Sequence, residues 1–84
     1  MYYVYVLQNE AKKLYFGCTN DLRKRLLQHN TGKSSSTKGH CWRLVYYEAY
    51  LSKLDAFNRE KQIKYHGQAK AQLKRRINDS LGKS

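Results

Sequence analysis

Several features of ordinary proteins are missing from this sequence, and each absence narrows the kind of protein that it encodes. The 84 residues include no proline and only two cysteines, Cys18 and Cys41. These cysteines have no CxxC or zinc-finger spacing, so they predict neither a disulfide-stapled secreted scaffold nor a zinc site. No apolar run approaches the ~20 residues of a membrane span, and the N-terminus lacks the basic-then-apolar order of a signal peptide. We therefore expect a protein of the reducing cytoplasm.

Acidic residues are also scarce. Six Asp and Glu face seventeen Lys and Arg, which gives a formal net charge of +11. The basic residues recur from Lys12 to Lys83 instead of forming one tail. Such a field attracts polyanions, so nucleic acid is the expected partner and an anionic membrane surface ranks second. A solvated surface that only aids solubility is the alternative.

A chain of this size forms one small domain with a modest core, which we place at residues 1–78, before a polar, frayed tail at 79–84. Runs rich in Tyr, Val and Leu predict three strands, at Tyr2–Leu7, Leu14–Cys18 and Trp42–Leu51. Helical spacing and capping residues predict three helices. The first spans Asn20–His29, with Asn20 or Asp21 as its cap, the second runs from a Ser52 cap to about His66, and the third runs from about Gln68 to Ile77.

Two local details accompany these elements. Alternation along the third strand predicts Leu44, Tyr46 and Glu48 on one face, and Gly67 is expected to end the second helix. The order strand, strand, helix, strand, helix, helix predicts an α+β fold, a three-stranded antiparallel sheet flanked by helices. The loop at residues 32–39 carries Lys33 and Lys38, and it is either a basic clamp on a substrate backbone or a plain linker.

Glu60 occupies a position where helical spacing calls for an apolar side chain, since Ala56 and Ile63 share its stripe. A carboxylate turned toward the core costs several kcal/mol unless a cation meets it. One interpretation is an ion pair with Arg59 or Lys64, or a helix rotated enough to expose the carboxylate. The other is a ligand for Mg²⁺, a hard ion that often takes only one or two protein carboxylates.

Arg25 lies at the edge of an apolar helical stripe, and His29, four residues later, falls beside it on a helix. Arg25 could stabilise the charge of a phosphate under attack, or its stem could simply cover the stripe. His29 could shuttle a proton, or it could face the dipole at the helix C-terminus. Gly17 interrupts the second strand where a bend or a close backbone approach is needed.

Tyr5 and Tyr15 would share a face if the first two strands pair as a hairpin. A phenol has a pKa of about 10, so it needs nearby positive charge to act as a base near neutrality. Arg25 and the basic field would supply that charge. The plainer interpretation is that both are fillers, because the chain has eight tyrosines.

These residues together resemble the GIY-YIG nuclease superfamily, in particular its small standalone bacterial members. The order of the matching positions carries the resemblance, since each three-residue motif is weak by itself. They are Tyr3-Val4-Tyr5 for the GIY element, Tyr15-Phe16-Gly17 for the YIG element, Arg25 eight residues later, His29 one turn further on, and Glu60 within REKQIK.

The resemblance implies hydrolysis of a phosphodiester bond by water with one divalent metal, Mg²⁺ or Mn²⁺. In that scheme Tyr5 or Tyr15 helps deprotonate the water, Arg25 holds the phosphate, His29 assists and Glu60 holds the metal. We expect further nucleic-acid contacts from a set of residues around the site: Gly17, Lys33, Lys38, Lys61 and Lys64.

The chain departs from the family pattern in three ways. Tyr3 and Val4 stand where the name of the first motif has Gly and Ile, and Phe16 replaces the Ile of the second motif. Some nuclease members place a lysine after the YIG glycine, where this chain has Cys18, which implies weaker catalysis. A chain of this size also leaves no room for a separate recognition domain, so we expect recognition of DNA structure, in repair or recombination at the nucleoid, or a partner protein that brings DNA. The alternative is a non-catalytic basic module that binds DNA or RNA and keeps the nuclease fold.

Overall fold

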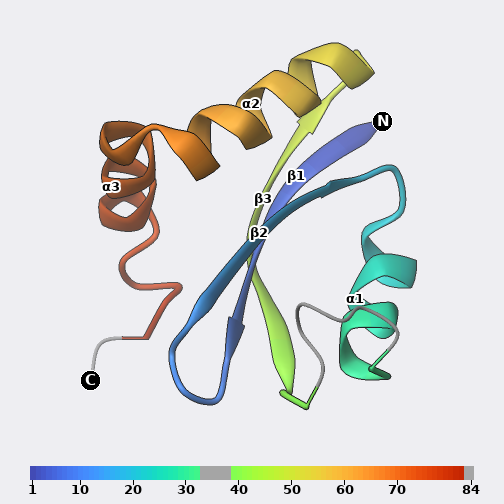
Figure 1. Cartoon of the computed structure of the whole chain (residues 1–84), viewed down its shortest axis with the longest axis vertical. Helices are drawn as coiled ribbons and strands as arrows, with labels where there is room; N and C mark the ends of the chain where they lie inside the picture. The colour runs from blue at the N-terminus through green and yellow to red at the C-terminus, as the bar shows by residue number, and fades with distance from the viewer. Residues whose placement is uncertain (33–38, 83–84) are drawn as a thin grey trace.

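The computed structural model describes residues 1–32 and 39–82. Three strands form one antiparallel sheet in the order β2-β1-β3, with β1 at Tyr2–Asn9, β2 at Leu14–Thr19 and β3 at Trp42–Tyr50 (Figure 1). The helices are α1 at Leu22–Asn30, α2 at Lys53–Tyr65 and α3 at Gly67–Arg76. The predicted α+β fold is confirmed, with its elements in the predicted order.

The central strand β1 is apolar on both faces because both faces are covered. Val4 and Val6 join the core formed with α2 and α3, where Ile63 and Leu73 are buried. Tyr5 and Leu7 belong to a second cluster on the opposite face. The apolar side of α1 packs against this cluster. A strand that is buried on both faces has a continuous run of apolar residues, which explains the sequence of residues 2–7.

The predicted caps of the first two helices are confirmed. The Asp21 side chain accepts a hydrogen bond from the Lys24 backbone at 3.1 Å, and the Ser52 side chain accepts one from Asp55 at 3.4 Å. The prediction for Gly67 is wrong, because Gly67 is the first residue of α3. The turn between α2 and α3 is made by His66 in an extended conformation, so no left-handed glycine is needed there.

The predicted face of Leu44 is also wrong. The β1–β3 pairing shifts between Val6 and Leu7, so that Val6 faces Tyr46 while Leu7 faces Leu44. One extra residue is accommodated there, a β-bulge, which turns Leu44 to the side of α1. Tyr46 and Glu48 remain on the side of α2, as predicted.

The C-terminal segment follows α3 in a series of turns. Ile77 is buried, and Leu81 from the segment expected to be frayed packs against the same core. The lysines of the predicted clamp, Lys33 and Lys38, lie outside the described residues. In the described part of the chain, no helix combines the length and the apolar character that a membrane span requires.

Candidate active site

The β1–β2 hairpin brings the two motif tyrosines to one face of the sheet. Tyr5 pairs with Gly17 and Leu7 with Tyr15, and the Tyr5 and Tyr15 ring centroids lie 6.3 Å apart. A Cβ added at Gly17 would lie 2.4 Å from the Tyr5 hydroxyl oxygen. The close approach predicted at this glycine is therefore the approach of the Tyr5 ring, which no larger residue would admit.

Helix α1 places Arg25 and His29 against the same phenol. The Tyr5 hydroxyl oxygen is 2.9 Å from His29 Nε2, and Arg25 Nε donates to that oxygen at 3.4 Å. The ring centroids of Tyr15 and His29 lie 4.8 Å apart. These four side chains come from three elements, so the structure brings together four of the five residues that were expected to share one pocket. The fifth, Glu60, lines a different cavity.

Burial fixes the protonation states of this cluster at neutral pH. It raises the pKa of the Tyr5 phenol to about 12, against the opposing effect of Arg25. Burial also lowers the pKa of His29, and the positive charge of Arg25 lowers it further. The phenol is therefore protonated and the imidazole neutral. Because Arg25 donates to the Tyr5 oxygen, the Tyr5 hydroxyl can donate its own proton to His29 Nε2.

Arg25 is held at two points. Besides the bond to Tyr5, its Nη1 donates to Gln28 Oε1 at 3.1 Å. The hydrogen bond to Tyr5 raises the pKa of Arg25, so the guanidinium is cationic. Arg25 lines a surface cavity of about 390 Å³ together with residues 18–21 at the end of β2. A fixed guanidinium at a cavity wall suits the binding of a phosphate oxygen.

Glu60 reaches the edge of β2 from α2, on the other side of the sheet. Its side chain is 14% exposed and forms an ion pair with Lys64, with 3.1 Å between Oε2 and Nζ. Lys64 Nζ in turn lies 5.8 Å from the centroid of the Tyr15 ring. The predicted ion pair is therefore formed with Lys64, whereas Arg59 pairs with Glu48.

The cavities of Glu60 and Arg25 adjoin. Glu60 lines a cavity of about 370 Å³, and residues 18–20 line both that cavity and the one beside Arg25. The charge of Glu60 contributes to the raised pKa of Tyr5, and after burial it is the next cause of the raised pKa of Cys18. The carboxylate therefore lies within electrostatic range of the tyrosine cluster, although it belongs to a different face of the fold.

The chemistry of the Glu60 cavity fits a hard divalent cation. Besides Glu60, the polar residues Thr19 and Asn20 line it, together with Lys53. Across residues 1–32 and 39–82, no three His, Cys, Asp or Glu side chains are grouped closely enough to hold a metal. Mg²⁺ and Mn²⁺ favour oxygen ligands, and Mg²⁺ is often bound by one carboxylate with water and substrate phosphate, so Glu60 suffices for this mode of binding.

The residues expected to contact nucleic acid are placed differently from one another. Gly17 is buried beneath the Tyr5 ring, in the floor of the site. Lys64 lies at the site through its contacts with Glu60 and Tyr15. Lys61 is exposed, with Nζ 4.9 Å from the centroid of the Phe57 ring beside the Glu60 cavity. Their contacts with nucleic acid remain predictions.

Two features of the site were missed at the level of sequence. Gln28, which anchors Arg25, stands three residues after it, and this helical spacing could have found it. Glu48 was seen only as a strand residue. It accepts hydrogen bonds from Tyr46 at 2.8 Å, Tyr50 at 2.6 Å and Arg59 at 2.9 Å and 3.1 Å, and so ties β3 to α2.

Comparison with known proteins agrees with this geometry. Residues 1–76 match the GIY-YIG catalytic domain, so the chain belongs to the GIY-YIG family, a family of nucleases. Among its relatives is a UPF0213 protein of Clostridium perfringens, 42% identical over 66 residues, which are 76% of this chain and 71% of the relative.

Two further relatives carry the same name. A UPF0213 protein of Bacillus pumilus is 38% identical over 65 residues, 75% of this chain and 66% of the relative. One of Haloquadratum walsbyi is 33% identical over 73 residues, 84% of this chain and 82% of the relative. No solved structure matches the chain.

Proposed function

We propose that this protein is a metal-dependent endonuclease that hydrolyses phosphodiester bonds in DNA. One observation carries the proposal: Tyr5, Tyr15, Arg25 and His29 converge beside a cavity that adjoins the cavity of Glu60. Membership of the GIY-YIG family makes nucleic acid the substrate class. The preference for DNA, the metal and the roles below are the proposal.

Arg25 binds the scissile phosphate. Its guanidinium is fixed by Tyr5 and Gln28, so few rotamers are lost when a phosphate binds. The same cation stabilises the additional negative charge that develops on the phosphate oxygens during attack.

Tyr15 is the phenol that assists the attacking water. Tyr5 is only 2% exposed and its pKa is about 12, so it has little access to water and is almost never ionised near neutrality. Tyr15 is half-buried, so water can reach it, and it lies beside Lys64. The motif's first tyrosine is then a positioning residue for Arg25, and the second faces the reaction.

His29 acts through Tyr5. It is fully buried, so it cannot contact a phosphate on the surface. The prediction that His29 assists catalysis is kept in this form. Its neutral imidazole accepts a hydrogen bond from the Tyr5 hydroxyl and thereby orients the phenol oxygen toward Arg25.

Glu60 holds the divalent cation, Mg²⁺ or Mn²⁺, which would act as a Lewis acid on the phosphate when bound. Lys64 currently neutralises this carboxylate. If a divalent cation bound at Glu60 in place of Lys64, the Lys64 ammonium would be available to a phosphate.

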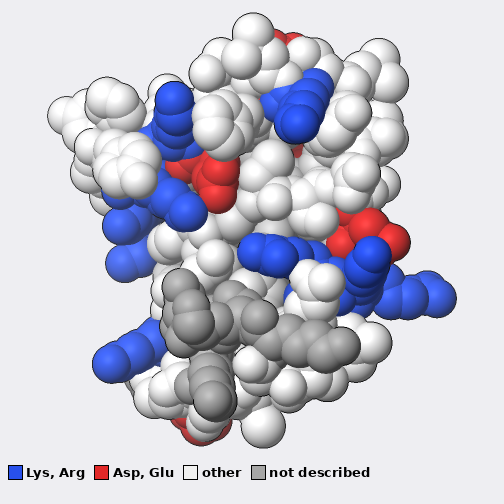
Figure 2. Space-filling model, turned by 45° about the vertical axis from the view of Figure 1, so that its right-hand side comes forward, with Lys and Arg blue, Asp and Glu red and all other residues white. Residues whose placement is uncertain are grey.

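Recognition of DNA shape rather than sequence is the third part of the proposal. Figure 2 shows Lys and Arg side chains spread over much of the face that it presents. Contacts of Lys and Arg with phosphates carry no direct information about sequence. Branched, flapped or nicked DNA is the expected substrate, in repair or recombination at the nucleoid of the cytoplasm, with a partner protein that brings DNA as a further possibility.

A second candidate is a non-catalytic module that binds DNA or RNA. The ion pair between Glu60 and Lys64 favours it, because a binding module would use this carboxylate only to fix a lysine.

Cleavage by the Glu60→Gln variant separates the two candidates. The substrates are labelled branched, flapped and nicked DNA and matched RNA, with Mg²⁺, with Mn²⁺ and with chelator. We expect the wild-type chain to cut DNA in a metal-dependent way and Glu60→Gln to lose cleavage while it still binds DNA. Arg25→Lys should slow cleavage about 100-fold or more, because lysine lacks the guanidinium fork.

Glu10→Gln is the matched control, since Glu10 is an exposed carboxylate paired with His40. It should cut at the wild-type rate. Absence of cleavage by the wild-type chain with both metals, or full activity of Glu60→Gln, would overturn the nuclease proposal and leave the binding module.

A further inference from the structure

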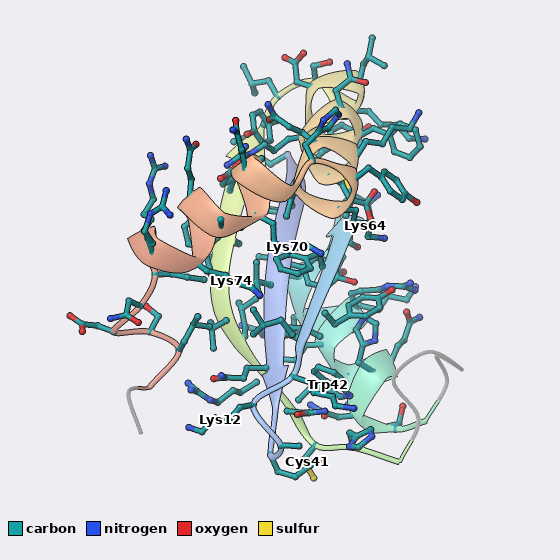
Figure 3. The ribbon with its side chains drawn as sticks, turned by 60° about the vertical axis from the view of Figure 1, so that its left-hand side comes forward. Lys12, Cys41, Trp42, Lys64, Lys70 and Lys74 are labelled. Atoms are coloured by element: carbon teal, nitrogen blue, oxygen red, sulfur yellow. The ribbon has the colours of Figure 1, made fainter. Side chains whose placement is uncertain are left out.

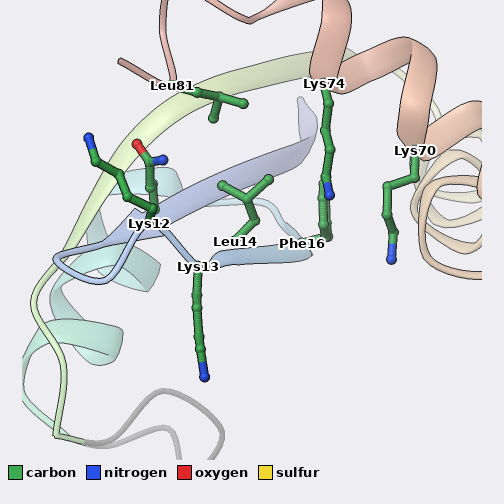
Figure 4. Close-up of a pocket in the computed structure, with 8 residues that line it drawn as sticks. Lys12, Lys13, Leu14, Phe16, Lys70, Lys74 and Leu81 are labelled. Carbon is green, nitrogen blue, oxygen red and sulfur yellow. The ribbon is translucent and has the colours of Figure 1, made fainter. Parts of the chain in front are cut away.

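A groove of about 470 Å³ lies between β2 and α3, on the other side of the sheet from Tyr5 and Tyr15 (Figure 4). Four lysines line it, Lys12 and Lys13 from the β1–β2 turn and Lys70 and Lys74 from α3. The apolar side chains that line the groove are Leu14, Phe16 and Leu81.

The charge of this lysine groove is not neutralised within the described protein. No Asp or Glu lines the groove. The three ion pairs formed among residues 1–32 and 39–82 use other side chains. Four lysines that line one groove attract an anion, so binding of an anion there lowers the free energy.

The turn that carries two of the lysines is rigid. The buried Asn9 side chain accepts hydrogen bonds from the backbone of Ala11 at 2.9 Å and of Lys13 at 3.0 Å. Lys12 has φ of 67°, in the left-handed region that glycine or asparagine occupies at lower cost.

The helix side of the groove is ordered as well. Lys70 Nζ lies 5.4 Å from the centroid of the Phe16 ring, which restrains the side chain over the apolar floor. In Figure 4 the Lys70 and Lys74 side chains extend from α3 toward β2. The lysines of the two elements therefore line one groove.

The groove and the candidate active site lie on opposite faces of β2, which is an edge strand of the sheet. Alternate residues of this strand serve the two regions, Tyr15 at the site and Leu14 and Phe16 in the groove. In Figure 3 Lys64, Lys70 and Lys74 follow one another beside β2, and Lys12 lies near its other end. Lys64 is the lysine that contacts Glu60 and Tyr15.

We propose that the lysine groove binds the phosphate backbone of the DNA segment that flanks the cleavage point. The inference rests on the proposed function for the identity of the substrate, while its evidence comes from residues outside the catalytic cluster. Lysine ammonium groups bind phosphates as point charges at any sequence, and their stems cover the apolar floor. An acidic protein is less well suited, because the strand that lines the groove, β2, carries Tyr15 of the nuclease-family site on its other face.

The test measures the salt dependence of DNA binding. A chelator is present so that the DNA is not cleaved during the measurement. Affinity for a long branched DNA is followed by fluorescence anisotropy at several salt concentrations. Each lost phosphate contact lowers the slope of log K against log salt concentration by about 0.7 to 0.9. We expect Lys70→Gln/Lys74→Gln to lower that slope by about 1.4 to 1.8.

Arg75→Gln is the control, because Arg75 is the exposed neighbour of Lys74 on α3 and does not line the groove. It should leave the slope unchanged. Lys12→Gly is the second variant, since glycine accepts the left-handed turn without the ammonium group. It should fold as well as the wild type and lower the slope by about 0.7 to 0.9.

An unchanged slope in the groove variants, or an equal loss with Arg75→Gln, would overturn the inference. Competition by polyglutamate as effective as that by DNA would assign the groove to an acidic protein instead, which also overturns it. A chain that fails to cleave DNA but shows the lowered slopes would refute the nuclease proposal alone. If the wild-type chain cleaved DNA but the groove variants had unchanged salt slopes, only the proposal for the groove would be refuted.

Discussion

The Tyr5 hydroxyl oxygen lies close to a guanidinium, an imidazole and the backbone of the neighbouring strand. Arg25 donates to it, His29 lies within hydrogen-bond distance, and Gly17 leaves the space in which it sits. A change at any of these positions therefore affects both the folding and the placement of the guanidinium.

Gly17→Ala tests this crowding. Its Cβ would lie 2.4 Å from the Tyr5 oxygen, so the ring must move. We expect a loss of about 1–3 kcal/mol in the free energy of unfolding, measured by urea denaturation, and a loss of cleavage. Gly67→Ala is the control, because nothing lies within 4 Å of an added Cβ at the start of α3. Equal stability of the two variants would contradict the close packing at Tyr5.

His29 makes stability depend on pH. Burial lowers its pKa below the usual 6.5, so the unfolded chain binds a proton more readily than the folded chain. The contribution of neutral His29 is present above about pH 6.5 and is lost as the pH falls from there toward the lowered pKa. We expect the free energy of unfolding to decrease between about pH 7.5 and pH 5.

The His29→Gln variant should be less stable at about pH 7.5, because it loses the imidazole packing. Its free energy of unfolding should change less than that of the wild type down to about pH 5, since the titrating group is gone. Both free energies are measured by urea denaturation. If the free energy of unfolding of His29→Gln changed with pH as much as that of the wild type, another group would be responsible.

At the level of elements, β3 and α2 depend on each other through Glu48. Its side chain is 15% exposed and accepts hydrogen bonds from two tyrosines and Arg59. Burial alone would raise the pKa of this carboxyl, but the hydrogen bonds from Arg59, Tyr50 and Tyr46 lower it overall. The network fixes the helix that carries Glu60 against the sheet that carries Tyr5.

Glu48→Gln should destabilise this joint. The amide replaces an acceptor with a donor that would face Arg59 or a tyrosine, so we expect a loss of about 1–3 kcal/mol in urea denaturation. Glu10→Gln, which alters an exposed pair, should have a much smaller effect. Equal effects of the two variants would mean that the Glu48 network contributes no more than a surface contact.

The elements and the site were predictable from the sequence to different degrees. Strand composition and the capping residues Asp21 and Ser52 act locally, so the order and approximate bounds of the elements were predicted. The bulge that reverses Leu44 depends on pairing with β1, and the role of Gly67 depends on how His66 turns the chain. Neither is encoded within a few residues.

For the site, motif spacing predicted the convergence of Tyr5, Tyr15, Arg25 and His29. It could not predict which phenol is buried, because burial depends on how α1 packs over the sheet. It also could not decide between an ion pair and a metal ligand at Glu60. The structure shows the ion pair with Lys64, and the metal remains part of the proposal.

On the scale of the whole molecule, a formal charge of +11 is confined to a body of 31 × 28 × 19 Å. Repulsion among these charges opposes folding and is screened by salt, whereas attraction to nucleic acid is weakened by the same screening. The two properties should therefore respond to salt in opposite directions.

We expect the urea midpoint of unfolding to rise between about 50 mM and 500 mM NaCl, while DNA affinity falls steeply over the same range. The free protein is the sample for the first measurement and a labelled oligonucleotide reports the second. A midpoint that decreases with salt would mean that ion pairs such as Arg59–Glu48 outweigh the net repulsion.

The alternation of β2 also constrains the length of the turn before it. Side chains along a strand project to opposite faces, so one inserted residue between Asn9 and Leu14 that shifted the pairing would invert the whole strand. Tyr15 would then point toward α3, and Phe16 would take its place beside His29. Insertions in this hairpin should thus be as harmful to the protein as the replacement of a catalytic side chain, although the turn itself lies on the surface.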